Sequence, residues 1–556
     1  METIKMKRGL GLWIILLLAV YAAGLTCDLS EPWVGMHDWN GAFFSQLARN
    51  HLRHPASIHH GLPIVAAGAG TPPPGDRSIY ATHPPGLVWL LAGLFRLCGE
   101  SEAVARMLPI GSSLVSLGLL VWLVSRAYDP RIAITAGTIY AVMPMSVYFG
   151  RMVDHEAVCL MSMLGMAAAW SMLRSARISP ATRAAAASAW GGLLLLGAWV
   201  DWPVILFSGL LCLSAVRAYR SESISSRLFA TVLGWTALAI VCMLTYVVYF
   251  GLEGRWGDWI AILTSRSIEP DGGVLRRDGA SPGGPLRYTI ENLSWPLVML
   301  ALVGTATTAR RWYSSRNNRS ESSPERGNTP LPRVGAEGND TDGSIAARQG
   351  LSLILWTGLI WVAVFWRQYE RHNYWLFYLG PAATVLAARG LFVLWNRLRR
   401  ISAKMAYGIA GGLLIATLFV EILGTRDYFI RVAYPPAEVE DWRRIRDMTA
   451  EGDGVLLFRN PFRIEIRGKY RFRNMVPPHI PYYLDRRIAF ERDFEAVVRQ
   501  ADEFAVFVMP SRDAAHYQES WRDVLGGFPR MSLEGKVVFD LRGEQPDRPM
   551  GVQSLK

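Results

Sequence analysis

Residues 131–173 read RIAITAGTIYAVMPMSVYFGRMVDHEAVCLMSMLGMAAAWSML. Two apolar runs, 132–150 and 157–173, each approach the roughly 20 residues that a helix needs to cross a bilayer. The polar turn between them, residues 151–156, ends in three consecutive ionisable side chains. Because charge beside lipid hydrocarbon is costly, such a turn indicates a functional site at the mouth of a membrane-spanning bundle.

The composition of the whole chain agrees with this interpretation. Of its 556 residues, 51% are hydrophobic, and the mean hydropathy is +0.18. Apolar residues come in blocks of span length, which predicts a polytopic α-helical membrane protein rather than a soluble one. The net charge of +12 is typical of cytoplasmic loops that hold Lys and Arg. It does not predict a nucleic-acid partner, whereas membrane lipids are expected partners.

The basic N-terminus is followed by an apolar run from Gly9 to Thr26. This run is longer than a signal-peptide core and lacks a clear cleavage site, so we predict a retained first span. In all, about eleven runs have the length and apolarity of spans. Their approximate cores are residues 9–27, 104–125, 132–150, 157–173, 184–200, 202–218, 228–250, 291–309, 350–366, 374–395 and 405–424.

Charge sets the expected orientation. Lys and Arg gather in alternate connections, while the short turns at Asp154 and Asp201 hold one basic residue between them, Arg151. By the positive-inside rule the N-terminus is cytoplasmic, and an odd number of spans places the C-terminal segment outside. We therefore expect a multi-pass protein of the plasma or inner membrane.

The spans and loops make up a predicted transmembrane domain, residues 1–426. It has two long outer loops, 28–103 and 251–290. Residues 314–349 are rich in Ser, Gly, Pro and charge, which predicts a disordered inner loop because such a segment buries too little apolar area to fold.

Residues 427–556 are predicted to form an extracytoplasmic α/β domain of ordinary size. No GxGxxG or P-loop motif occurs in it, so a nucleotide site is not predicted. We expect helices near 438–448 and 494–500 and buried strands at 455–458, 504–509 and 537–541.

The first candidate site residue is Asp38, in the motif MHDWN after the first span. Its carboxylate either accepts a proton or binds a divalent cation. Alternatively, Asp38 only caps the following helix, since Asp is a favourable N-cap.

His83 lies in the motif THPPG. Two prolines fix the chain direction and favour a helix start just after them. His83 then contacts a phosphate or a metal ion, or it is a solvated residue in a helix-entry turn.

Asp154 and Glu156 are two residues apart at the outer end of the third span. Both carboxylates can reach one cation from an extended segment, and hard oxygen ligands suit Mg²⁺ or Mn²⁺, with Asp38 as a possible third ligand. The alternative is a polar turn without a bound ion. Asp201, at another outer turn, is the weaker candidate.

Arg371, His372 and Tyr374 precede the tenth span. Guanidinium groups pair well with phosphate oxygens, so these residues are candidates for holding a phosphate near the membrane. Tyr374 and its neighbour Trp375 are also typical of an aromatic belt.

The order of these motifs is that of a known family. HDWNGAFFSQLARNHL, THPPGLVWLLAGLFRLCGESEAVARMLP and YFGRMVDHEA follow one another, and YERHNYWLFYLGPAATVLAARG comes later. Over about residues 1–175 the chain resembles the GT-C-fold glycosyltransferases. The likeness is to the bacterial and archaeal branch related to protein O-mannosyltransferases and to the aminoarabinose transferase of lipid A.

The resemblance implies a reaction and roles. These enzymes take a sugar from a polyprenyl-phosphate carrier on the outer side of the membrane. The family's first-loop acid maps to Asp38, the acid after the third span maps to Asp154 with Glu156 as its partner, and the HPPG segment places His83 near the donor phosphate. His37 stands where the family often has a second acid, which leaves dependence on a divalent metal open.

The expected function is therefore transfer of a sugar from a polyprenyl-phosphate donor to a lipid, glycan or protein acceptor. Asp38 is the expected base, and Arg371 or His372 would stabilise the leaving phosphate. The family implies inversion at the anomeric carbon. The alternative is a transporter or flippase of lipid-linked sugars, although such proteins usually show repeated halves with sites at mid-membrane.

Overall fold

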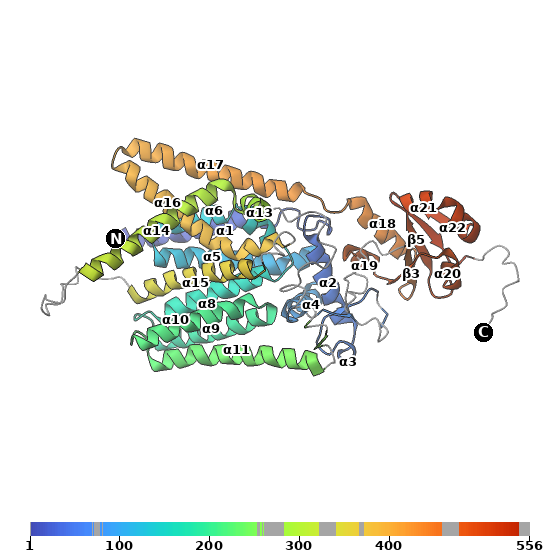
Figure 1. Cartoon of the computed structure of the whole chain (residues 1–556), viewed down its shortest axis with the longest axis horizontal. Coiled ribbons are helices and arrows are strands. Elements are labelled where there is room, and N and C mark those ends of the chain that lie inside the picture. Colours follow the sequence, from blue (N-terminus) through green and yellow to red (C-terminus); the bar gives the residue numbers. More distant parts are fainter. Residues whose placement is uncertain are drawn as a thin grey trace.

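The computed structural model describes residues 2–68, 70–71, 78–80, 82–252, 256–257, 260, 283–321, 341–365, 372–458 and 477–543. A bundle of long helices carries a layer of short helices at one end, and a small α/β unit lies beyond that layer (Figure 1). The N-terminus and the α/β unit are at opposite ends of the molecule.

Among the residues that the structure describes, eight helices are long and apolar enough to cross a membrane, which confirms a polytopic helical protein. The last but one includes a 3-10 turn, η3 (Asn373–Leu379), ahead of its α-helix. The eight are α5 (Glu102–Ala127), α8 (Glu156–Leu173), α9 (Pro180–Val200), α10 (Pro203–Arg220), α11 (Ser226–Leu252), α15 (Thr341–Val364), η3 with α16 (Gly380–Arg399), and α17 (Ala403–Ile430).

Two pairs of helices in the described part of the chain are apolar but bent, and they bring the number of spans to ten if each pair counts as one span. Helices α6 (Pro130–Tyr140) and α7 (Pro144–Gly150) meet at 57°, because Pro144 cannot continue the hydrogen bonding of α6. Helices α13 (Gly283–Leu293) and α14 (Trp295–Glu321) meet at 93°. Helix α1 (Glu2–Leu25) has a shorter apolar part, and each of the eleven predicted ranges falls on one of these helices.

The predicted disordered loop, 314–349, is wrong at both ends. Helix α14 continues to Glu321, and α15 already begins at Thr341. The start of α15 is helical because it packs on α8, where Ser171 Oγ donates to the carbonyl of Gly343 at 2.7 Å. Tertiary contacts here outweigh a polar composition. Residues 322–340 lie outside the described part of the chain.

The described part of the predicted first outer loop, 28–103, forms the layer across the end of the bundle (Figure 1). Its main helices, α2 (Asp38–Arg53) and α4 (Gly86–Cys98), pack on each other and on α5. One short helix and one antiparallel pair of strands lie between them in the sequence: α3 (Ala56–His59), β1 (Ile64–Val65) and β2 (Ser78–Ile79). Most of the second predicted outer loop, 251–290, is outside the described residues.

The α/β unit contains a five-stranded sheet of order β4-β3-β5-β7-β6. Predicted strands 455–458, 504–509 and 537–541 and both predicted helices are present, whereas β4, β6 and three short helices were not predicted. Strand β4 was missed because it is a half-exposed edge strand without an apolar run. The elements are α18 (Pro436–Asp447), β3 (Gly454–Phe458), α19 (His479–Leu484), β4 (Arg487–Glu491), α20 (Phe494–Arg499), β5 (Val506–Pro510), α21 (Ser511–His516), α22 (Gln518–Leu525), β6 (Arg530–Ser532) and β7 (Lys536–Asp540).

Helices α14 and α16 cross at glycines. A Cβ atom added to Gly304 would lie 2.0 Å from the carbonyl oxygen of Leu386, and one added to Gly390 would lie 2.2 Å from that of Leu300. Small residues let backbones of membrane helices approach this closely, and packing then replaces the hydrophobic effect as the force that joins them.

We therefore expect Gly304→Ala or Gly390→Ala to separate the two helices and to cost about 1–3 kcal/mol of stability. Gly412→Ala, on α17 where an added Cβ meets nothing within 4 Å, is the matched control and should be neutral or stabilising. Thermal unfolding in detergent measures the difference. Equal midpoints for the three variants would contradict the close crossing.

Candidate functional site

Asp38 is the first residue of α2 and turns its carboxylate back toward the preceding loop. The backbone N–H of Gly35 donates to Asp38 Oδ2 at 2.8 Å. The cap residue of α2 is His37, in a left-handed conformation with φ +68°, and it makes no side-chain capping bond. Asp38 is therefore not the cap of its own helix, and its carboxylate faces the bundle.

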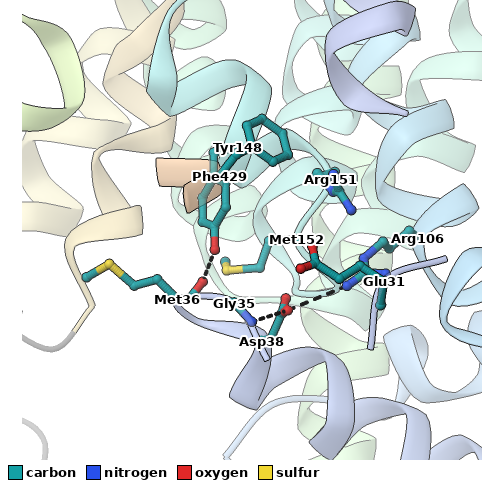
Figure 2. Close-up of a pocket in the computed structure, with 9 residues that line it drawn as sticks. All are labelled: Glu31, Gly35, Met36, Asp38, Arg106, Tyr148, Arg151, Met152 and Phe429. Atoms are coloured by element: carbon teal, nitrogen blue, oxygen red, sulfur yellow. Dashed lines mark hydrogen bonds and ion pairs between the residues drawn. The ribbon is translucent and has the colours of Figure 1, made fainter. Parts of the chain in front are cut away.

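The Asp38 carboxylate lines a small pocket that is partly open to solvent. Figure 2 shows side chains from the first loop, α5, α7, the turn after α7 and the end of α17 converging on it. The lining residues are Glu31, Gly35, Met36, Asp38, Arg106, Tyr148, Arg151, Met152 and Phe429.

Two arginines hold the loop around this pocket. Arg106 Nη2 lies 3.5 Å from Asp38 Oδ2, and Arg106 Nη1 donates to the carbonyls of Leu29 and Glu31 at 2.8 and 2.6 Å. Arg151 donates to the carbonyl of Asp28 at 2.9 Å. Two cations therefore face two carboxylates, Asp38 and Glu31, and the pocket is close to neutral.

Burial raises the pKa of Asp38, and the cations Arg106 and Arg151 and the N–H of Gly35 oppose this rise. Burial also raises the pKa of Glu31, with the negative charge of Asp38 as a second cause. A raised pKa makes a carboxylate a better proton acceptor than a solvated one.

Asp154 lies in a second cluster. Its Oδ1 accepts from the backbone N–H of His155 at 2.8 Å and contacts His155 Nδ1 at 2.6 Å. Its Oδ2 accepts from the side chain of Asn40 at 2.5 Å. Asn40 follows Asp38 by two residues on α2, so the first loop and the turn after the third span are joined through Asn40 and not through Asp38.

His83 belongs to the same cluster. Its ring centroid is 4.2 Å from that of His155, and its Nε2 is 3.7 Å from Asp201 Oδ1. The hydroxyl of Tyr80 hydrogen-bonds to its Nδ1. His83 is therefore packed between the turns that hold His155 and Asp201 rather than solvated.

Tyr374 lies on η3 and is buried, with its ring 5.5 Å from that of His37. Its hydroxyl is 2.5 Å from His372 Nδ1. Burial lowers the pKa of His37 to about 4, against the opposing charge of Asp154, so that ring is neutral at physiological pH. The predicted Arg371 lies outside the described residues.

Of the predicted Mg²⁺ or Mn²⁺ ligands, Asp154 and Glu156 lie close enough to interact electrostatically, whereas Asp38 does not join them. Both oxygens of Asp154 already bind protein donors, and Asp38 faces the separate pocket. Glu156 is buried at the start of α8, and its Oε2 has no hydrogen-bond partner in the described part of the chain. Within the same residues no three His, Cys, Asp or Glu side chains are placed to hold a metal ion. No step is therefore assigned to a metal.

Comparison with known proteins agrees with this architecture. The family model for dolichyl-phosphate-mannose-protein mannosyltransferases matches residues 82–200, from the HPPG turn to the end of α9. ArnT from Cupriavidus metallidurans, solved with undecaprenyl phosphate, is 13% identical, with a TM-score of 0.58 over 97% of this chain and 98% of that chain. The chain has the GT-C fold. The resemblance to O-mannosyltransferases and ArnT, predicted from the sequence, is confirmed.

A second GT-C structure has similar coverage of this chain. The oligosaccharyltransferase AglB from Archaeoglobus fulgidus, solved with an inhibitory peptide and a dolichol-phosphate, is 12% identical, with a TM-score of 0.54 over 97% of this chain and 75% of that chain. No curated protein matches the chain in sequence.

Three site residues of this GT-C chain were missed in the sequence. Arg106 had a usable signal, because it is a charge inside a predicted span. Asn40 and Tyr148 had none: an amide beside an aspartate and a tyrosine within an apolar run are both common. Tyr148 is placed only by the fold, where its hydroxyl donates to the carbonyl of Met36.

The contact between Asn40 and Asp154 generates a prediction. Asn40→Asp would bring two carboxylates together and should cost about 1–3 kcal/mol of stability, because one of them must then take up a proton. The swapped double variant, Asn40→Asp with Asp154→Asn, restores an amide–carboxylate pair. It should recover most of the loss in thermal unfolding. Additive effects of the two changes would show that these side chains do not interact.

Proposed function

We propose that the chain is a membrane glycosyltransferase that moves a sugar from a polyprenyl-phosphate donor to a lipid, glycan or protein acceptor. The fold is that of ArnT and AglB along almost the whole chain, and the structures of those two proteins hold undecaprenyl phosphate and dolichol-phosphate. The observation that carries the proposal is the Asp38 carboxylate, which lines a pocket at the mouth of this bundle beside two arginines.

Asp38 is the proposed base. It removes the proton of the acceptor hydroxyl while that oxygen attacks the anomeric carbon, and the bond from this carbon to the phosphate oxygen breaks. The electron pair of the broken bond leaves with polyprenyl phosphate. Attack opposite the leaving group inverts the anomeric centre. The balanced charge of the pocket suits a neutral acceptor better than an anionic donor phosphate.

The second cluster is the proposed place of the donor phosphate. His83, His372 and Tyr374 offer N–H and O–H donors there, and Arg371 would add a guanidinium. Fixed donors stabilise the charge that develops on a leaving phosphate. Asp154 supports this cluster by holding Asn40 and His155 rather than by contacting a metal.

The proposed orientation puts this end of the bundle outside the cytoplasm. The α/β unit lies at the same end (Figure 1), while α16 ends at the far side with Arg397, Arg399 and Arg400. The positive-inside rule supports a cytoplasmic location for that far side.

Asp38→Asn keeps the size of the side chain but removes the base. We expect transfer from a radiolabelled polyprenyl-phosphate sugar to fall at least about a hundredfold, with thermal unfolding close to that of the unmodified chain. Asp447→Asn, at a side chain that is 67% exposed on α18, is the matched control and should transfer normally. Near-normal transfer by the Asp38 variant would refute the assigned base.

The pH profile gives a second test. The base works when deprotonated, and burial raises the pKa of Asp38. The rate constant kcat/KM should therefore decline on acidification at a higher pH than for a solvated aspartate. Arg106→Gln removes the nearest opposing cation and should move this decline to still higher pH, whereas Arg106→Lys should not. If kcat/KM declined at the same acidic pH in both variants, the role of Asp38 would be contradicted.

A further inference from the structure

One hydroxyl of the α/β unit bonds to the loop that carries the proposed base. The backbone N–H of Trp33 donates to the hydroxyl oxygen of Tyr483 at 2.7 Å, and this hydroxyl donates to Glu102 Oε1 at 2.9 Å. Tyr483 lies on α19, Glu102 is the first residue of α5, and Trp33 precedes Asp38 by five residues. Tyr483 therefore joins the α/β unit, the loop and the bundle at one atom.

The next contacts lead from Trp33 to Asp38. The guanidinium of Arg106 lies 4.3 Å from the centre of the Trp33 ring, within cation–π distance. The same guanidinium is 3.5 Å from the Asp38 carboxylate. Trp33 and Arg106 are both buried, at 1% and 2% exposure, so neither can move without displacing the other.

The α/β unit also has contacts with α2 that do not involve this hydroxyl. Arg53 donates through two nitrogens to the two oxygens of Asp485, each at 2.7 Å, and Arg49 donates to the carbonyl of Tyr482 at 2.8 Å. A two-point guanidinium–carboxylate pair is among the stronger polar contacts in proteins. Loss of the Tyr483 hydroxyl should therefore leave the unit docked on α2.

The loop has a second fixed side as well. The backbone of Val34 accepts from the N–H of Ala433 at 2.7 Å, and Met36 donates to the carbonyl of Arg431 at 3.3 Å. These bonds come from the chain just after α17 and hold the end of the loop near Asp38. Tyr483 holds its other side, at Trp33.

We infer that Tyr483 is a positioning residue for the proposed base: its hydroxyl fixes Trp33, and through Arg106 it fixes the Asp38 carboxylate. The inference rests on the proposed function and adds a role for the α/β unit, which completes the catalytic site. Without the hydroxyl, the buried N–H of Trp33 has no acceptor and Glu102 loses a donor. Such groups are costly to leave unsatisfied, so the loop relaxes toward other partners.

The test compares Tyr483→Phe with Tyr517→Phe in the full-length protein. Tyr517 lies in the same unit between α21 and α22 and packs on Phe458, away from α2. We expect kcat of Tyr483→Phe to fall about tenfold or more with KM for the donor within about twofold, since a misplaced base impairs the chemical step more than binding. Amide hydrogen exchange of residues 28–38 should be faster in this variant only.

Each outcome decides the matter. Unchanged exchange in residues 28–38 would overturn the inference, whatever the activity. Faster exchange with a normal kcat would overturn it too, because the loop would then be held without consequence for Asp38. A fall in kcat that Tyr517→Phe shares would indicate a general effect on the unit and would also refute it. If the unmodified chain transferred no sugar, the proposed function would fall, while faster exchange would still show that Tyr483 orders the loop.

Discussion

The site depends on one buried cation. Arg106 is 2% exposed near the first turn of a membrane-spanning helix, and a charge placed there without partners costs several kcal/mol. The loop after α1 supplies the partners: the carbonyls of Leu29 and Glu31, the ring of Trp33 and the carboxylate of Asp38. The conformation of this loop follows from the need to surround the guanidinium.

This constraint explains why distant segments meet at the site. A loop wrapped around Arg106 exposes backbone groups of its own, and these are satisfied by α7 through Tyr148, by the end of α17, and by α19 through Tyr483. Phe429 and Tyr148 line the pocket together with Asp38 (Figure 2). Several distant segments of the fold therefore meet at the pocket, which is also a candidate site. Changes in the residues that line it should alter both stability and activity.

Sequence reasoning succeeded where the physical signal is local. Apolar length predicted the spans, which are present as helices. Charge next to lipid predicted sites at Asp38 and Asp154, and these stay predictions. Sequence reasoning failed where a single backbone angle sets the direction in which the side chains of a helix point. The left-handed His37 turns α2 so that Asn40, and not Asp38, reaches Asp154, and no periodicity signals such a residue. Composition predicts disorder at the start of α15, because composition does not show that this segment packs on α8.

The split between Asp38 and Asn40 has a geometric consequence for the proposed reaction. Residues two apart on a helix point to different sides, so α2 presents its carboxylate to the pocket and its amide to the cluster of Asp154, His155 and His83. An inverting displacement needs the attacking hydroxyl and the leaving phosphate on opposite faces of the anomeric carbon. The proposed base and the proposed phosphate donors face different sides of the first turn of α2, so an in-line transfer requires the sugar to lie beside this turn, within reach of both. Under the proposed function, the two clusters, which the sequence predicts as one metal centre with Asp38 as a possible third ligand, are the two ends of a single in-line transfer.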